Sequence, residues 1–289
     1  MLTPVTPPGF VLAAIAVLTP ALGAAQRFRS DSFVTPDSVR IRYLVQGSGT
    51  PVVLIHGFAL SAELNWAAPG AMDSLAGSFM VIAPDLRGHG QSAKPHDAAV
   101  YGMRFVDDVV ALLDHLQIRR AHVAGYSLGA TIALRVAAAH PDRVRAVVLG
   151  GGGWQPPGVP PPPFLGQWLA DLDRAALGEM AVSDALRRSD MPNIPPAVKA
   201  ALDRNDAAAL AAALRSLGAL ALPEADVRAL RVPTLAIVGE LDPARAIADA
   251  LAKLLPQLSV TIIAGADHAA AMAHPRLAGA MVAFLRSLP

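Results

Sequence analysis

The chain has 289 residues, a formal net charge of +1 and no cysteine. The balanced charge gives no general attraction to nucleic acid, and the lack of cysteine excludes disulfides, thiol catalysis and cysteine-ligated metals. The length allows one large domain, or one domain that carries an insertion, around a substantial core.

The N-terminus is apolar from Gly9 to Ala25 and is followed by Gln26 and Arg27. The stretch ends in small residues, as a secretory cleavage site requires, although no Lys or Arg precedes it. At about 17 residues and with Pro20 inside, it is marginal as a spanning helix. We therefore expect residues 1–25 to be a signal peptide or an N-terminal hydrophobic segment. A secreted or periplasmic protein without stable membrane insertion would follow, and a cytoplasmic protein is the alternative.

The remaining chain alternates strand-like and helix-like segments. Helices are expected at 62–77 with a break at Pro69-Gly70, at 101–117, directly after Ser127, at 244–255 and at about 275–287. Most of the strands are unbroken apolar runs, which is typical of strands buried on both faces of a parallel sheet. The pattern predicts an α/β fold, with a mostly parallel sheet covered by helices on both faces. The expected strands are 32–34, 39–45, 51–55, 79–83, the run that ends at Gly125, 144–149, 234–238 and 259–263.

The composition changes after Trp154. Residues 155–163 are rich in proline, and residues 164–222 read as alanine-rich helices. Because this segment falls between two strands, we predict a helical cap at 154–229, inserted into a core made of 26–153 and 230–289. The few aromatic side chains there are expected to line an apolar substrate pocket: Trp154, Phe164 and Trp168.

The chain is organised around Gly125-Tyr126-Ser127-Leu128-Gly129, which joins a strand to a helix. This is the G-x-S-x-G pattern, in which a sharp turn holds a serine hydroxyl clear of the sheet. The glycines are needed because the strand reverses straight into the helix, and neighbouring backbone leaves no room for larger side chains. We predict Ser127 as a nucleophile, while a plain helix-starting turn is the alternative.

A serine nucleophile needs a base and a group that orients the base. Asp242 and His268 each follow a predicted strand, where the carboxyl ends of parallel strands place functional residues. Ser127, Asp242 and His268 also occur in the chain order described for α/β-hydrolases. Three competitors are less well placed: Glu240 is expected to turn to solvent, Asp267 adjoins the histidine, and His274 is expected to be a surface or capping residue.

An oxyanion that develops in the reaction needs two preorganised donors. The sequence predicts the backbone N–H of Leu128, directly after the nucleophile, and that of Phe58, in the loop after Ile55. His56 is expected to be a structural hydrogen-bonding residue. Asp85, Arg87 and His89 could form a charged or metal-binding cluster, but we expect them to brace their glycine-rich loop.

These motifs resemble those of the α/β-hydrolase superfamily, in its lid-bearing branch of esterases, lactonases, C–C bond hydrolases and cofactor-free haloperoxidases. The resemblance covers about residues 32–153 and 230–288 and is weak over the cap. Because Ser127 stands where epoxide hydrolases and haloalkane dehalogenases carry an aspartate, it implies an acyl-enzyme. The motifs that carry it are His56-Gly57-Phe58, Asp85-Leu-Arg-Gly-His-Gly-Gln-Ser92, Gly125-Tyr-Ser-Leu-Gly129, Gly239-Glu-Leu-Asp242 and Asp267-His268.

The expected function is hydrolysis of carboxylic esters of small molecules by a Ser127–His268–Asp242 triad, without metal or organic cofactor and without nucleic acid. C–C bond hydrolysis, lactone opening and perhydrolysis are alternatives on the same triad. A ligand-binding receptor that retains the fold is the alternative from a different class of protein.

Overall fold

The computed structural model describes residues 28–187 and 195–289. The predicted signal peptide at 1–25 lies outside these residues. Within them, eight strands form one sheet in the order β1-β2-β4-β3-β5-β6-β7-β8. The strands are β1 (Arg29–Val34), β2 (Arg40–Gln46), β3 (Thr50–Ile55), β4 (Phe79–Pro84), β5 (Ala121–Tyr126), β6 (Val144–Gly150), β7 (Thr234–Gly239) and β8 (Leu258–Ile263).

The sheet is mostly parallel, as the sequence predicts. From β4 through β3 to β8 all neighbouring strands run in the same direction, whereas β2 pairs antiparallel with both β1 and β4. Every residue of β5 and of β7 is buried, which explains why these strands are apolar throughout instead of alternating. The α/β fold class is confirmed.

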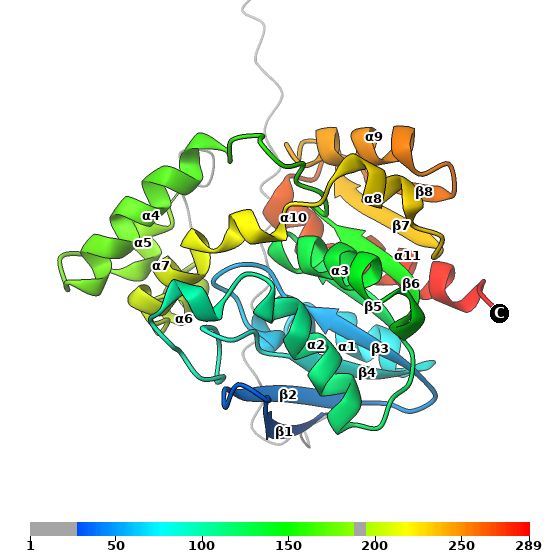
Figure 1. Ribbon diagram of the computed structural model, residues 1–289, viewed down its shortest axis with the longest axis horizontal. Coiled ribbons are helices and arrows are strands. Elements are labelled where there is room, and N and C mark those ends of the chain that lie inside the picture. The colour runs from blue at the N-terminus through cyan, green and yellow to red at the C-terminus, as the bar shows by residue number, and fades with distance from the viewer. Residues whose placement is uncertain (1–27, 188–194) are drawn as a thin grey trace, which may run out of the picture.

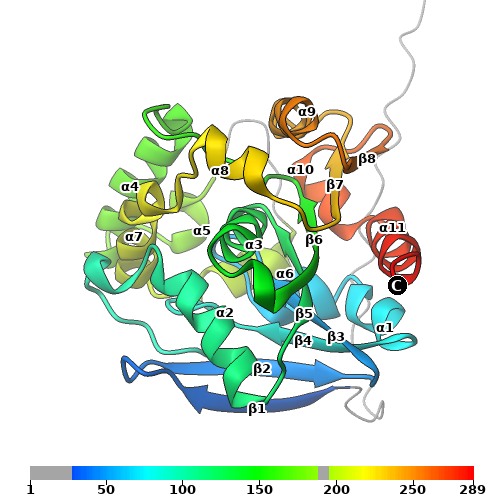
Figure 2. The same cartoon turned by 45° about the vertical axis from the view of Figure 1, so that its right-hand side comes forward.

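Helices cover both faces of the sheet (Figures 1 and 2). One hydrophobic core joins the sheet to α2, α3 and α9, and a second core joins the opposite face to α1 and α11. The helices of this part are α1 (Ala71–Ala76), α2 (Arg104–His115), α3 (Leu128–Ala139), α9 (Arg245–Leu254), α10 (His268–Ala273) and α11 (Pro275–Arg286), with the short turns η1 (Glu63–Ala67), η2 (Ala98–Val100) and η3 (Pro141–Arg143).

The chain between β6 and β7 is helical, and its first helices gather to one side of the sheet (Figure 1). Here α4 packs on α7, and their apolar side chains form a core of their own that includes Leu172 and Leu210. From Leu217 onward the segment instead packs against the main core, where Val227 lies. The helices are α4 (Pro163–Ala176), α5 (Val182–Ala185), α6 (Pro196–Leu202), α7 (Ala207–Arg215), η4 (Leu217–Leu220) and α8 (Glu224–Ala229).

No single helix among the described residues is long and apolar enough to cross a membrane. The bent pair Ala207–Arg215 and Leu217–Ala229 reaches the required length and composition only when the two helices are taken together.

Candidate active site

Ser127 occupies a strained turn between β5 and α3. Its backbone has φ 53° and ψ −115°, a conformation that non-glycine residues rarely adopt. The turn is so tight that a Cβ atom on Gly125 would lie 2.0 Å from the carbonyl oxygen of Gly129. A Cβ atom on Gly129 would lie 2.0 Å from the carbonyl oxygen of Ile55 in the neighbouring strand. Packing thus requires both glycines of the motif and fixes the serine at the carboxyl end of β5.

Asp242 and His268 meet at the same edge of the sheet. Asp242 follows β7 and is 4% exposed, and His268 is the first residue of α10 after β8. The ring Nδ1 of His268 lies 2.8 Å from Oδ2 of Asp242, so the carboxylate favours the tautomer with a proton on Nδ1. The other carboxylate oxygen accepts a 2.9 Å hydrogen bond from the N–H of Ala244, which fixes the orientation of the acid.

The glycine-rich segment after β6 brings this pair next to the serine. A Cβ atom on Gly151 would lie 3.0 Å from Cε1 of His268, and one on Gly152 would lie 3.1 Å from the carbonyl oxygen of Ser127. Two consecutive glycines therefore contact the histidine and the serine in turn. With Nδ1 directed at Asp242, the free Nε2 of His268 is the nitrogen that can accept a proton.

Tyr126 is a residue of this site that sequence reasoning missed. Its hydroxyl donates a 2.6 Å hydrogen bond to the carbonyl oxygen of His268, and the two rings lie 5.2 Å apart. Burial raises the pKa of the phenol, so it remains a donor at neutral pH. The sequence did offer a signal, because an aromatic residue with a polar tip directly precedes the serine on a fully buried strand and needs a partner.

The loop after β3 lies directly over the serine. A Cβ atom on Gly57 would lie 3.5 Å from Cβ of Ser127. Among the described residues, no hydrogen-bond acceptor is found for the backbone N–H of either Phe58 or Leu128. The Gly57 N–H, by contrast, donates to Oδ1 of buried Asn65 at 2.8 Å. The two predicted donors are therefore the ones left available for an oxyanion.

His56 takes the structural role expected from the sequence. Its Nδ1–H donates to the carbonyl oxygen of Gly57 at 2.8 Å, and its Nε2 accepts from the N–H of Leu86 at 2.9 Å. Complete burial lowers its pKa to about 4, so the ring is neutral at pH 7. Because both ring nitrogens are in hydrogen bonds, His56 braces the loop after β3 and is not free to act as a base.

The glycine-rich loop after β4 is braced by its charged residues, as expected. Asp85 accepts from the N–H groups of Ala62 and Gln91, and burial raises its pKa. Buried Arg87 pairs with Asp37 and Asp108, two acids far away in sequence.

Nδ1 of His89 forms a hydrogen bond with the carbonyl oxygen of Arg87. Burial is the main cause that lowers the pKa of His89 to about 3, and the nearby His56 lowers it further. Within residues 28–187 and 195–289, no group of three or more His, Cys, Asp or Glu side chains is placed to hold a metal ion.

The competing residues have other partners. Glu240 accepts from the N–H of Gly265, and Asp267 caps α10 by accepting from the N–H of Ala270. His274 caps α11 by accepting from the N–H of Arg276. These contacts stabilise turns and helix ends around the Asp242–His268 pair.

The cap meets the site through aromatic rings. Trp168 stacks on Phe58 with ring centroids 6.1 Å apart, and Phe164 meets Trp168 edge-on at 5.0 Å. The Trp154 indole N–H instead donates to the carbonyl oxygen of Leu222 at 2.8 Å, which ties that residue to the end of the cap segment. Of the three aromatic residues predicted to bind substrate, Trp168 thus directly contacts Phe58, the residue predicted to supply an oxyanion donor.

Comparison with known proteins agrees with this architecture. A family model for the alpha/beta hydrolase fold matches residues 50–189. Superposition on a thermophilic esterase from Thermogutta terrifontis gives a TM-score of 0.73 at 26% identity, covering 90% of this chain and 98% of that one. The chain belongs to the α/β-hydrolase superfamily.

Two further superfamily members are similar to this α/β-hydrolase. A serine hydrolase involved in carbazole degradation superposes with a TM-score of 0.71 at 26% identity, covering 90% of this chain and 99% of that one. A 2-hydroxymuconate semialdehyde hydrolase from Pseudomonas sp. (strain CF600) is 44% identical over 107 residues, which is 36% of this chain. The chain spans 26% to 37% of the length of the first curated relatives that it matches.

Proposed function

We propose that this α/β-hydrolase cleaves carboxylic esters of small molecules through an acyl-enzyme on Ser127. The observation that carries the proposal is the 2.8 Å contact between Asp242 and Nδ1 of His268, at the edge of the sheet where the strained Ser127 is presented. Acyl transfer by a serine requires a catalytic triad, in which a carboxylate orients an imidazole and the imidazole activates the serine hydroxyl. The similarity to an esterase over 90% of the chain supports the same reaction class.

The proposal gives each group a role. Nε2 of His268 takes the Ser127 proton as the hydroxyl oxygen attacks the ester carbonyl, and Asp242 stabilises the imidazolium that forms. The N–H groups of Phe58 and Leu128 bind the oxyanion of the tetrahedral intermediate. His268 then protonates the departing alcohol, and water, activated by the same histidine, releases the acid from Ser127.

Hydrolysis of a C–C bond next to a ketone is the second candidate, because the 2-hydroxymuconate semialdehyde hydrolase is 44% identical over its matched segment. That chemistry requires polar groups that handle an enol or enolate. In the cap, Arg174, Lys199 and Arg215 are instead in ion pairs with neighbouring acids.

The cap contacts the loop after β3 through the stacked rings of Trp168 and Phe58 and through a hydrogen bond from Asn205 to the carbonyl oxygen of Ala59. The ring contacts suit an apolar acyl or alcohol group. We therefore favour esters.

The test is a panel of p-nitrophenyl esters of increasing acyl length, with wild type and Ser127→Ala. Intact mass is measured after treatment with a phosphonate inhibitor. We expect turnover and one phosphonyl adduct in wild type, and neither in the variant, with circular dichroism unchanged. Turnover that survives in Ser127→Ala would rule out the acyl-enzyme. A phosphonyl adduct without ester turnover, together with cleavage of a vinylogous diketone, would favour the C–C hydrolase.

A further inference from the structure

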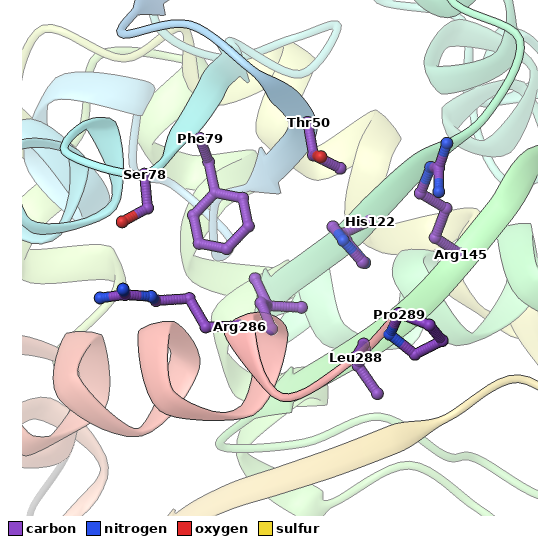
Figure 3. A pocket seen from close by; sticks show the side chains of 9 residues that line it. Thr50, Ser78, Phe79, His122, Arg145, Arg286, Leu288 and Pro289 are labelled. Atoms are coloured by element: carbon purple, nitrogen blue, oxygen red, sulfur yellow. The ribbon is translucent and has the colours of Figure 1, made fainter.

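A cavity of about 440 Å³ lies at the edge of the sheet opposite to Ser127. It opens where β3, β4, β5 and β6 begin and where α11 ends (Figure 3). Its volume falls within the range of about 300–1,000 Å³ that is typical of small-molecule sites. Because the predicted catalytic residues follow the carboxyl ends of the strands, this cavity is separate from the candidate active site and does not depend on the proposed function.

The polar side chains that line the cavity have no hydrogen-bond or ion-pair partner among the described residues. They are the side chains of Thr50, Ser78, His122, Arg145 and Arg286. His122 is the most informative, because it is only 5% exposed and its Nδ1 is buried without a partner. Nε2 of the same ring also has no partner but is accessible, so Nε2 is the atom that a ligand in the cavity can contact.

The charge of the cavity wall is positive. Arg145 and Arg286 reach out on opposite sides of His122 (Figure 3). Among the described residues, no acidic side chain lines this cavity and neither arginine forms an ion pair. Guanidinium groups bind carboxylate and phosphate through paired N–H donors. The buried arginines of the core differ, since Arg87 is fully paired with two acids.

The chemistry of His122 fits an anion. Burial, and then the positive charge of Arg145, lower its pKa to about 4, so the ring is neutral at pH 7 and carries one N–H donor. Next to it the wall is apolar, with Phe79 edge-on to the imidazole at 6.1 Å and Leu285 of α11 close by. A ligand with both an oxyanion and an apolar part could bind the polar side chains through its charge and pack its apolar part on Phe79 and Leu285.

We propose that this cavity binds a small organic anion. Its carboxylate or phosphate group contacts His122 and Arg145, Arg286 closes the opposite side, and its apolar part packs on Phe79 and Leu285. The full-length protein tests this with benzoate, phenyl phosphate and inorganic phosphate, by calorimetry and by NMR of the histidine ring protons. His122→Asn assigns the His122 resonance, and a separate variant assigns that of His268.

We expect benzoate and phenyl phosphate to shift the His122 resonance and to bind more tightly than inorganic phosphate. Arg145→Gln should weaken that binding about tenfold, and Arg286→Gln should weaken it less. Arg276→Gln is the matched control, since this exposed arginine lies in the first turn of the same helix α11, away from the cavity. A shift of His268 instead of His122, equal affinities in Arg145→Gln and Arg276→Gln, or inorganic phosphate binding as tightly as benzoate would each overturn the proposal. The preference between benzoate and phenyl phosphate identifies the anionic group.

Discussion

The hydroxyl of Tyr126 donates a 2.6 Å hydrogen bond to the backbone carbonyl oxygen of His268. These residues are 142 positions apart, and each adjoins a part of the proposed machinery: Tyr126 precedes the serine, and His268 carries the general base. The bond therefore ties the end of β5 to the start of α10. We expect this bond to fix the distance of the imidazole from Ser127, while the contact with Asp242 fixes the orientation of the ring.

Replacement of Tyr126 by Phe should lower kcat of ester hydrolysis about tenfold with little change in KM, because small displacements of a catalytic group are costly. The free energy of unfolding should fall by about 1 kcal/mol, the net contribution of one hydrogen bond. The matched control is Tyr101→Phe, which removes a buried tyrosine bond to the carbonyl oxygen of Pro95. That variant should lose similar stability and retain kcat. Equal kcat values in the two variants would show that Tyr126 has no positioning role.

Replacement of Asp242 by Asn should reduce kcat by roughly 10³- to 10⁴-fold, because an amide can donate to Nδ1 and hold the ring in the wrong tautomer. The measurement is kcat with a p-nitrophenyl ester under saturating conditions. Glu240→Gln is the control, since Glu240 is exposed and accepts from the N–H of Gly265. A larger loss in Glu240→Gln than in Asp242→Asn would transfer the orienting role to Glu240.

The sheet could be predicted from the sequence because buried parallel strands need unbroken apolar runs, such as the one that contains Val52 and Leu54. The sharp turn at Ser127 between β5 and α3 could also be predicted, because only glycine fits at positions 125 and 129. Tyr126 was missed because its partner is a backbone carbonyl, and no residue type marks that carbonyl in a sequence. The partners of Arg87 were missed for a similar reason, since Asp37 and Asp108 come from distant segments that only the fold brings together.

The cap was harder to resolve. Its alanine-rich sequence predicts helices but does not indicate which of their faces contact the core. Two contacts depend on how the cap packs against the loop after β3. They are the stacking of Trp168 on Phe58 and the hydrogen bond from Asn205 to the carbonyl oxygen of Ala59. The same applies to the segment from Leu217, which the composition assigns to the cap and the structure packs on the main core.

Replacement of Gly129 by Ala should destabilise the protein by more than about 3 kcal/mol or prevent folding, because the new Cβ would lie 2.0 Å from the backbone of Ile55. Gly166→Ala provides the contrast. Gly166 lies in α4 with no atom within 4 Å of an added Cβ, so alanine should stabilise the helix by roughly 0.5–1 kcal/mol. Urea unfolding and soluble yield measure both effects. Comparable stability of the two variants would contradict the claim that packing at the Ser127 turn leaves no room for a side chain at position 129.

The Arg87 ion pairs should make stability depend on pH. The hydrogen bond from Arg87 holds the pKa of Asp37 at about 2, below its ordinary value of 3.8. A carboxyl group whose pKa is depressed by folding binds protons more weakly in the folded than in the unfolded state. Because Asp37 is exposed and its charge is screened by solvent, its contribution is reduced to about 1 kcal/mol. This contribution is present above about pH 4 and is lost as the pH falls toward 2.

Replacement of Asp37 by Asn should remove that part of the pH dependence. The free energy of unfolding, measured in urea between pH 2 and pH 6, should fall less steeply below pH 4 in the variant than in wild type. The difference between the two curves isolates Asp37, because Asp108, the other partner of Arg87, is present in both proteins. Asp107→Asn, in an exposed pair with Arg104, should follow the wild-type curve. Parallel curves for wild type and Asp37→Asn below pH 4 would mean that the ion pair does not couple folding to proton binding.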